Sequence, residues 1–325
     1  MILKKSLPLQ QGLLTCFNDD ISIGLLIQTS KNTVCNFLDI DNLSNLGVFL
    51  IKEKITSPST YLNNDILYLI TDDGIFGYDS FSGQHAIKFQ SSNLIPLDFC
   101  HGNKKIYAIC GIPLVNSKQV NTENICLSTF NAQNGKKIYQ GQNVPGLFLS
   151  PIYHDNKIWC LMEKDLHEFN TTCELVGTIQ LSFIPNYPPI ISNKYVCVAS
   201  EDGNMEIFDE NRHRYLKIFV EKNNSAPICI DSNIIIWAGL ENLHIINIDK
   251  RSTEKIQLNS QITSSLTYSN GIIYAGDKLG NLVSINISTK EVNTLPVSKL
   301  PLFKPMAINN YVFVASQIGL YQCII

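Results

Sequence analysis

The stretch NNDILYLITDDGIFGYDSFSGQ, Asn63 to Gln84, contains two short apolar runs that are joined by a tight acidic turn and followed by a second turn. Apolar runs of this length on either side of an Asp-Gly turn predict a β-hairpin. Taken alone, the hairpin could be a local feature, a binding site or one copy of a repeat. The rest of the chain decides between these interpretations.

The same pattern recurs along the chain at a nearly constant interval. Successive copies are 39, 52, 38, 40, 37 and 39 residues apart when they are aligned on one apolar residue: Tyr68, Tyr107, Trp159, Cys197, Trp237, Tyr274 and Phe313. The long interval contains an insertion of 52 − 39 = 13 residues within Gly111 to Asn124. With an earlier copy at Asp20 to Asn42, eight copies account for nearly all 325 residues.

Each hairpin is flanked by two further short apolar runs, so each repeat is expected to contain four strands. The run before the hairpin usually opens with a proline: Pro58, Pro96, Pro151, Pro189, Pro227 and Pro305. Proline lacks an N–H group, and the first residue of a strand is one place where this costs no ladder hydrogen bond.

A repeat of about 40 residues with four strands is typical of a β-propeller, because a single four-stranded blade cannot bury both of its faces alone. We therefore expect an all-β chain, an eight-bladed β-propeller of four-stranded antiparallel blades that forms one domain over residues 1–325. The chain stops at the third strand of the last blade. Residues 2–9 resemble a fourth strand, and we expect them to complete that blade and close the ring.

The repeats resemble those of the quinoprotein-like, or PQQ-like, β-propeller superfamily over essentially the whole chain. The resemblance is carried by SPIYHDNKIWC (Ser150 to Cys160), GIIYAGDKLGNLVSINISTK (Gly271 to Lys290) and the opening stretch. In the enzymes of this superfamily the repeat ends in an Asp, Thr-Gly and Trp pattern. The best match here has Asp79, Ser82–Gly83 and Ile87 in place of tryptophan, so the resemblance implies a non-enzymatic, scaffold-type member.

Bulk composition narrows the function classes. Charged residues are only 16% of the chain and the net charge is −3, which gives no broad affinity for nucleic acid or anionic membranes. No apolar run is long enough to span a bilayer. Lys4 and Lys5 precede an apolar segment that Gln10 to Gly12 interrupt, so we expect no signal peptide and a cytoplasmic protein. The alternative is a periplasmic or lipid-anchored protein, if Leu13 to Cys16 is a lipoprotein signal.

The polar and sulfur-containing residues give no catalytic, cofactor or metal site. Ten cysteines are scattered through apolar runs without a CxxC pair, which predicts small buried hydrophobes and a reducing compartment. The acidic turns at Asp72–Asp73, Glu201–Asp202 and Asp277 invite a cation site, but Asp and Gly are also what tight turns require. Asp79, Asp209 and Asp249 follow third strands, where we expect them to accept backbone hydrogen bonds in Asx-turns.

The remaining candidates are surfaces. The insertion supplies Pro113, Val115 and Lys118, and FIPNYPPI (Phe183 to Ile190) supplies Phe183 and Tyr187, although ordinary packing between blades would also explain the latter pair. We expect a non-enzymatic scaffold that binds a protein or peptide and is monomeric outside its complex. The alternatives are an enzyme or small-ligand binder that uses the central channel, and a quinone-binding or sensory relative of the dehydrogenases.

Overall fold

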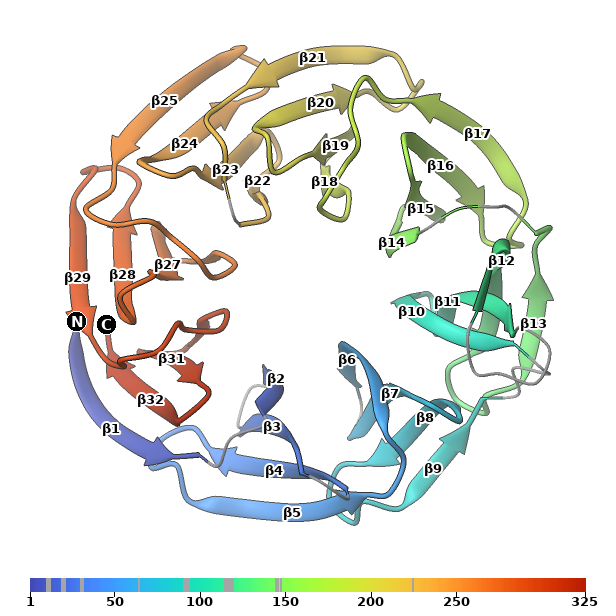
Figure 1. The fold of residues 1–325 in the computed structure, drawn as a ribbon, viewed down its shortest axis with the longest axis horizontal. Coiled ribbons are helices and arrows are strands. Elements are labelled where there is room, and N and C mark those ends of the chain that lie inside the picture. Colours follow the sequence, from blue (N-terminus) through green and yellow to red (C-terminus); the bar gives the residue numbers. More distant parts are fainter. Residues whose placement is uncertain are drawn as a thin grey trace. The chain divides into compact units, whose positions relative to one another are not determined.

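The computed structural model describes residues 1–9, 13–18, 22–29, 32–63, 65–89, 94–113, 120–143, 146, 148–223 and 225–325. These residues form 32 strands in eight four-stranded antiparallel sheets, so the fold is the predicted eight-bladed β-propeller (Figure 1). In each blade, strands that follow one another in the chain pair side by side. None of the described residues forms a helix long and apolar enough to cross a membrane.

The chain divides into two compact units. Unit 1 contains Met1–Gln28, Asn36–Leu46 and Ile190–Ile325, and unit 2 contains Thr29–Cys35 and Gly47–Pro189. The blade whose strands contribute to both units consists of β2 (Leu13–Asn18), β3 (Ser22–Gln28), β4 (Thr33–Asp39) and β5 (Asn45–Ile51).

Unit 2 contains three complete blades. They are β6 (Ile55–Asn63), β7 (Ile66–Thr71), β8 (Gly74–Asp79) and β9 (His85–Lys88); β10 (Ile95–Gly102), β11 (Lys105–Pro113), β12 (Val120–Asn131) and β13 (Lys137–Gln140); and β14 (Phe148–His154), β15 (Lys157–Met162), β16 (Asp165–Asn170) and β17 (Leu175–Gln180).

Unit 1 contains four complete blades. They are β18 (Ile190–Ser192), β19 (Tyr195–Ala199), β20 (Asn204–Phe208) and β21 (Arg214–Phe219); β22 (Ile228–Asp231), β23 (Ile234–Ala238), β24 (Asn242–Asn247) and β25 (Ser252–Gln257); β26 (Thr267–Ser269), β27 (Ile272–Gly276), β28 (Asn281–Asn286) and β29 (Val292–Pro296); and β30 (Met306–Ile308), β31 (Tyr311–Ser316), β32 (Gly319–Ile324) and β1 (Ile2–Pro8).

The N-terminal strand completes the last blade, as the sequence predicted. β1 runs antiparallel to β32, from the pair Ile2 and Ile324 to the pair Pro8 and Gly319. The two ends of the chain therefore lie beside each other in unit 1 (Figure 1). This pairing covers the edge of β32, which would otherwise expose unpaired backbone N–H and C=O groups.

The hydrophobic core lies between neighbouring blades, because the two central strands of a blade are buried on both faces. All five residues of β19 are buried, and so are five of the six residues of β7. One core cluster joins Ile70 and Phe89 to Ile106 and Phe130 of the next blade in unit 2. Stacking the blades therefore supplies the burial that a single blade lacks.

The third strand of seven blades ends in an Asx-turn. In the opening stretch, Asp79 Oδ1 accepts hydrogen bonds from the backbone of Phe81 (3.2 Å) and Ser82 (2.7 Å). Equivalent bonds are accepted by Asp39, Asn131, Asn170, Asp209, Asn247 and Asn286. The prediction for Asp249 was wrong. Asn247 occupies the turn position, and Asp249 instead accepts bonds from Tyr195 and Asn233.

A residue with positive φ closes each of these turns, and at several of them it packs against the fourth strand of the preceding blade. Gly83 has φ 67°, and a Cβ there would clash with the ring of Phe49 in β5. The same position in β22–β25 is Arg251, whose guanidinium lies 4.6 Å from the centre of the Tyr215 ring in β21. Within each unit, the turns therefore interlock neighbouring blades.

The pairing of the strands corrects the alignment of one repeat. Tyr274 pairs with Ser284, two residues before the turn residue Asn286, and the equivalent residue of β23 is Ile236 rather than Trp237. The alignment on Trp237 was thus wrong by one residue, and the intervals from Cys197 become 39 and 38. Both Ile236 and Trp237 are fully buried, so hydrophobicity alone could not separate them.

The prolines occupy two kinds of position. Pro189, Pro227 and Pro305 stand directly before β18, β22 and β30, as predicted. Pro58, Pro96 and Pro151 lie inside longer strands, at or next to places where the register with the neighbouring strand shifts. A β-bulge leaves a residue outside the regular ladder, so a missing N–H is tolerated there as well.

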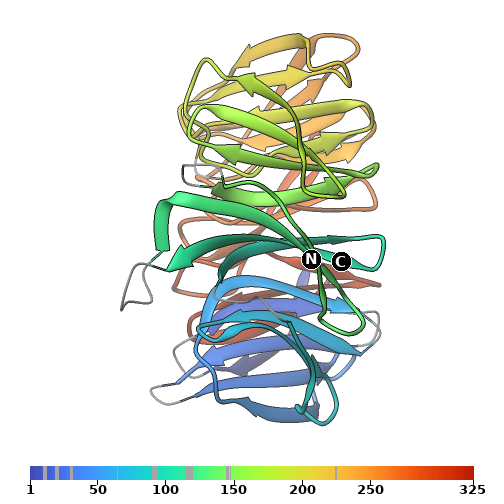
Figure 2. The ribbon, with the colours of Figure 1, turned by 90° about the vertical axis from the view of Figure 1, so that its right-hand side faces the viewer.

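The described part of the insertion is strand rather than loop. It lengthens β11 and β12 to nine and twelve residues, and Ile112 pairs with Asn121 and Pro113 with Val120 beyond a register shift at Gly111. Figure 2 shows these two strands, coloured teal to green, running side by side. The described part of the insertion therefore extends the two central strands of its blade.

Candidate functional site

In two of the acidic turns, the carboxylates of Asp72 and Asp277 accept hydrogen bonds within the fold. Asp277 is fully buried, and its Oδ1 accepts from the backbone of Leu279 (2.9 Å) and Asn281 (2.8 Å). Its Oδ2 accepts from the Asn281 side chain and from Ser260. Asp72 accepts a bond from the Lys54 backbone at 3.1 Å. The described residues contain no group of three or more His, Cys, Asp or Glu side chains that could hold a metal ion.

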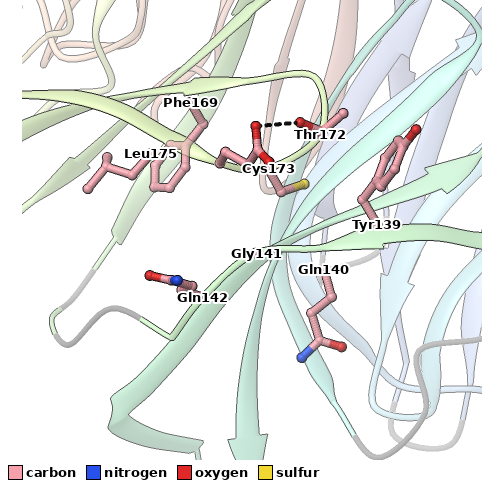
Figure 3. A pocket seen from close by; sticks show the side chains of 9 residues that line it. Tyr139, Gln140, Gly141, Gln142, Phe169, Thr172, Cys173 and Leu175 are labelled. Carbon is pink, nitrogen blue, oxygen red and sulfur yellow. Dashed lines mark hydrogen bonds between the residues drawn. The ribbon is translucent and has the colours of Figure 1, made fainter.

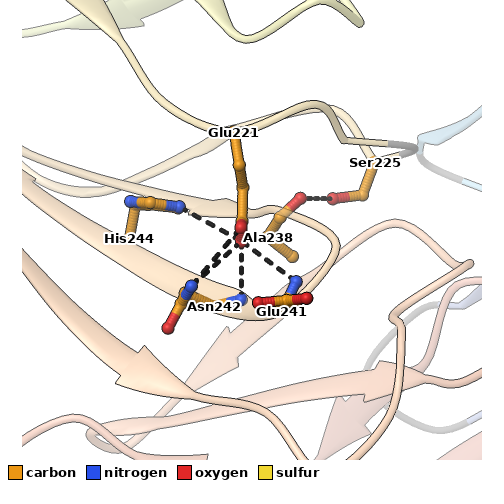
Figure 4. Close-up of polar contacts among 6 residues, drawn as sticks. All are labelled: Glu221, Ser225, Ala238, Glu241, Asn242 and His244. Carbon is orange, nitrogen blue, oxygen red and sulfur yellow. Dashed lines mark hydrogen bonds and ion pairs between the residues drawn. The ribbon is translucent and has the colours of Figure 1, made fainter.

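One turn obtains its carboxylate from a different segment. Gly239, in the turn between β23 and β24, is equivalent to Asp277 in the next blade. Each of these two residues donates its backbone N–H to the carbonyl of the first residue of the third strand. Glu221, in the loop after β21, fills this role (Figure 4). Its Oε1 accepts from the backbone of Glu241 at 3.0 Å and of Asn242 at 2.6 Å.

The fit between Glu221 and this turn depends on the missing side chain at position 239. A Cβ at Gly239 would clash with the Glu221 carboxylate, whose carbon would lie only 2.6 Å away. Partial burial opposes ionisation of Glu221, but the hydrogen bonds from Asn242 and Glu241 and the charge interaction with His244 outweigh it and hold the pKa of this carboxyl below its ordinary value. The carboxylate of Glu221 is therefore bound by donor groups of the fold itself.

His244 lies beside this carboxylate and is almost fully buried. Its Nε2 is 3.5 Å from Glu221 Oε1, and neither ring nitrogen has a hydrogen-bond partner among the described residues. Burial lowers the pKa of the His244 imidazole, and the neighbouring Glu221 offsets this only in part. The pair forms a buried polar contact that is sensitive to pH.

A groove of about 530 Å³ lies in unit 2, and we call it the β13 groove (Figure 3). One wall is Tyr139 to Gln142, at the end of β13 and just beyond it. The other wall is Phe169 together with Thr172 to Leu175, which form the turn between β16 and β17. Tyr139 is 41% exposed and Leu175 is 50% exposed, so the groove presents one aromatic and one aliphatic side chain to solvent.

The floor of the groove is formed where Gly141, just beyond β13, packs against Cys173 of the next blade. A Cβ at Gly141 would clash with the carbonyl oxygen of Cys173, so only glycine allows this approach. The buried Cys173 Sγ lies 2.9 Å from Thr129 Oγ1 in β12. Burial raises the pKa of this thiol to about 11, which keeps it protonated at neutral pH. The floor is thus closely packed.

The carboxylate beside the groove is bonded within its own turn. Glu174 accepts bonds from Asn170 (2.7 Å) and Thr172 (3.1 Å), which hold the pKa of its carboxyl below the ordinary value. Gly141 donates its N–H to Leu127 in β12, so the alternation along a strand turns the N–H and C=O of Gln140 away from β12. β13 is the outer strand of its blade, so its edge away from β12 pairs with no other described strand.

None of the described residues that were predicted from the sequence lines the β13 groove. Pro113 is the last residue of β11, while Val115 and Lys118 lie outside the described residues. Phe183 and Tyr187 are half-buried between β17 and β18, where Ile184 is 60% exposed. Sequence reasoning missed the β13 groove. Cys173 at the turn position gave no distinct signal, because Arg251 and Lys290 also occupy the positions equivalent to Gly83.

All ten cysteines are free, and seven of them are buried. Cys110 and Cys126 belong to one inter-blade core, and Cys160 and Cys173 belong to the next. They pack as small hydrophobic residues, as predicted.

Solved structures with the same fold align with nearly the entire chain. The computationally designed Ika8 protein matches with a TM-score of 0.77 over 98% of each chain, at 12% sequence identity. BamB from Moraxella catarrhalis matches with a TM-score of 0.70 over 99% of each chain, at 14% identity. Similarity at this level of identity shows the β-propeller fold. No family model matches the chain, and no curated protein matches it in sequence.

Proposed function

We propose that this chain is a non-enzymatic member of the PQQ-like propeller superfamily, and that it acts as a scaffold or adaptor which binds a protein or peptide partner. The repeat pattern and the similarity to BamB support the placement in the superfamily. The proposal includes a cytoplasmic location and a single domain. Rigid blades favour binding because little conformational entropy is lost when a partner docks.

The observation that carries the proposal is the β13 groove. It combines a free strand edge with exposed apolar side chains from two neighbouring blades, Tyr139 and Leu175. An extended peptide that adds a strand to β13 would bond to the outward N–H and C=O of Gln140. Its side chains would pack between Tyr139 and Leu175.

The test is a selection for binding peptides. A random peptide library displayed on phage is selected against the intact chain, and the affinity of the selected peptides is measured by fluorescence anisotropy. Leu175→Asp places a charge on the apolar wall and should weaken binding at least about tenfold, since a buried leucine contributes roughly 1.5–3 kcal/mol.

The control is Phe219→Asp, which makes the same kind of change at a 72% exposed residue on the outer strand β21. It should leave the affinity unchanged. Equal affinity of the Leu175→Asp variant and the wild type for every selected peptide would refute the role of this groove. Failure to select any peptide or protein ligand would refute the proposed function itself.

A further inference from the structure

A second surface, in unit 1, combines exposed aliphatic residues with lysines. Three hydrophobic side chains are exposed there: Leu279 (61%), Leu300 (37%) and Ile318 (40%). Leu279 is in the turn between β27 and β28, Ile318 is in the turn between β31 and β32, and Leu300 is in the loop between β29 and β30. We call these residues and the pocket that the loop of Leu300 lines the Leu300 patch.

Backbone contacts join the three segments into one surface. Ser298 donates its N–H to the Gly280 carbonyl at 3.0 Å, and a Cβ at Gly280 would lie 2.9 Å from the carbonyl oxygen of Leu300. Further along the loop, Phe303 donates its N–H to the Ala315 carbonyl at 2.8 Å. The loop therefore connects the two hairpin turns, and the positions of the exposed side chains are fixed by the fold.

The patch contains an apolar pocket. It has a volume of about 250 Å³ and is lined by Leu300, Pro301, Leu302, Phe303 and Gln317. Leu302 forms a firm base, since it is buried against Gly276. A pocket of this size can take one aliphatic or aromatic side chain, and the hydrophobic effect favours filling it.

The charge around the pocket has one sign. Lys278, Lys299 and Lys304 are exposed, and their ammonium groups make no ion pair with any residue that the structure describes. The only acidic residue in the three segments, 276–280, 298–304 and 315–319, is the buried Asp277. Its carboxylate is already bonded to Leu279, Asn281 and Ser260.

From this arrangement we infer that the Leu300 patch binds an acidic peptide segment, which places one hydrophobic side chain in the pocket and its carboxylates beside the three lysines. The inference rests on the proposed function, since it names the chemistry of a partner for the same scaffold. The chain as a whole carries a net charge of −3, so a local excess of unpaired lysines is informative. A membrane is the poorer match, because anionic lipid surfaces are typically recognised by clusters of 4–8 basic residues.

The experiment uses three synthetic peptides of equal length and the intact chain. One has a central leucine pair flanked by glutamates, the second has lysines in place of the glutamates, and the third has serines in place of the leucines. Only the first should bind, and its affinity should fall as the salt concentration rises, because exposed charges are screened. Vesicles that contain phosphatidylserine are tested in parallel.

Lys299→Glu and Leu300→Ser should each weaken binding of the acidic leucine peptide, by about tenfold when combined. Lys250→Glu is the charge-matched control, since Lys250 is exposed in a turn of another blade of the same unit and should not affect the peptide. Thermal unfolding of each variant checks that it is folded.

Three results would overturn the inference: equal binding of the acidic and basic peptides, equal binding of the wild type and the combined variant, or binding to the vesicles without binding to the peptide. If the acidic peptide does not bind while library-selected peptides bind the β13 groove, the inference fails and the proposed function stands. If no peptide binds at either surface, both fail.

Discussion

Oε1 of Glu221 accepts the backbone N–H of Asn242 at 2.6 Å and so takes the place of an aspartate that the turn between β23 and β24 lacks. In the next blade Asp277 does the same for Asn281 from within its own turn. The backbone N–H at the start of the third strand thus finds its carboxylate acceptor within the turn in one blade, at Asp277. In the other blade the acceptor comes from the preceding inter-blade loop, at Glu221. This links the loop after β21 to the hairpin of the following blade.

The first prediction concerns this exchange. Glu221→Ala should lower the free energy of unfolding by about 2 kcal/mol, since two backbone donors lose a charged acceptor. In a Gly239→Asp background the same change should cost less than about 1 kcal/mol, because the new carboxylate can take over as Asp277 does and because removing the Glu221 side chain relieves its clash with the new residue. Urea denaturation of the four variants measures this coupling.

Glu241→Ala is the control for this cycle, because its side chain is exposed and only its backbone bonds to Glu221. It should be neutral. Equal costs of Glu221→Ala in both backgrounds would show that position 239 and Glu221 do not share a role.

The second prediction concerns pH. The pKa of His244 is lower in the folded protein than its ordinary value, so the folded state binds fewer protons than the unfolded chain. Stability should be complete above about pH 6.5 and should fall as the pH is lowered through the pKa of the folded state. Burial lowers the pKa of His101 and His167 in the same direction, so all three contribute.

His244→Gln should therefore reduce the loss of stability between about pH 7.5 and 5.5 without abolishing it. Urea denaturation at both pH values gives the difference. His213→Gln is the control, because the side chain of His213 is 81% exposed. An unchanged pH dependence in the His244→Gln variant would contradict the assignment. The lowered pKa of Glu221 adds a further loss at more acidic pH.

The third prediction separates backbone strain from steric fit. Gly83 and Gly271 both have positive φ, at 67° and 80°, but only Gly83 is packed against another side chain, Phe49. Gly271→Ala should cost about 1 kcal/mol, the usual penalty of the left-handed region. Gly83→Ala should cost clearly more than that, because the blade interlock must also shift. Similar losses in thermal unfolding would show that the interlock is loose.

The fourth prediction tests the role of the acidic turns. Asp277→Ala should lower the free energy of unfolding by about 3 kcal/mol, since it removes a buried charged acceptor and leaves its donors unpaired. Asp202→Ala, at an exposed position in the equivalent turn of another blade, should be nearly neutral. The comparison by chemical denaturation would contradict our account if both variants were neutral.

The sequence was sufficient for the architecture because the repeat is a local signal. Each blade carries its own turn residues and apolar runs, so the number of blades, the strands in each blade and the completion of the last blade by β1 all follow from patterns within about 40 residues. The errors occurred where two neighbouring positions satisfy the same pattern. Both Asn247 and Asp249 suit a turn, and both Ile236 and Trp237 suit a buried strand, so only the pairing register distinguishes them.

The site could not be predicted in the same way, because its parts come from different blades. The β13 groove needs Tyr139 and Leu175 on facing walls, 36 residues apart in the chain. The Glu221 contact likewise depends on a loop that belongs to the preceding repeat. The repeat pattern reports each blade separately and contains no information on which side chains meet between blades.

The most direct test of the account is amide hydrogen exchange of the intact chain, with and without a saturating library-selected peptide. If the partner adds a strand to β13, exchange of the Gln140 N–H should slow markedly, because this group faces away from β12 and gains a hydrogen bond only from the peptide. The Gly141 N–H, already bonded to Leu127, should change little. Unchanged exchange at Gln140 in the saturated complex would contradict the proposed mode of binding.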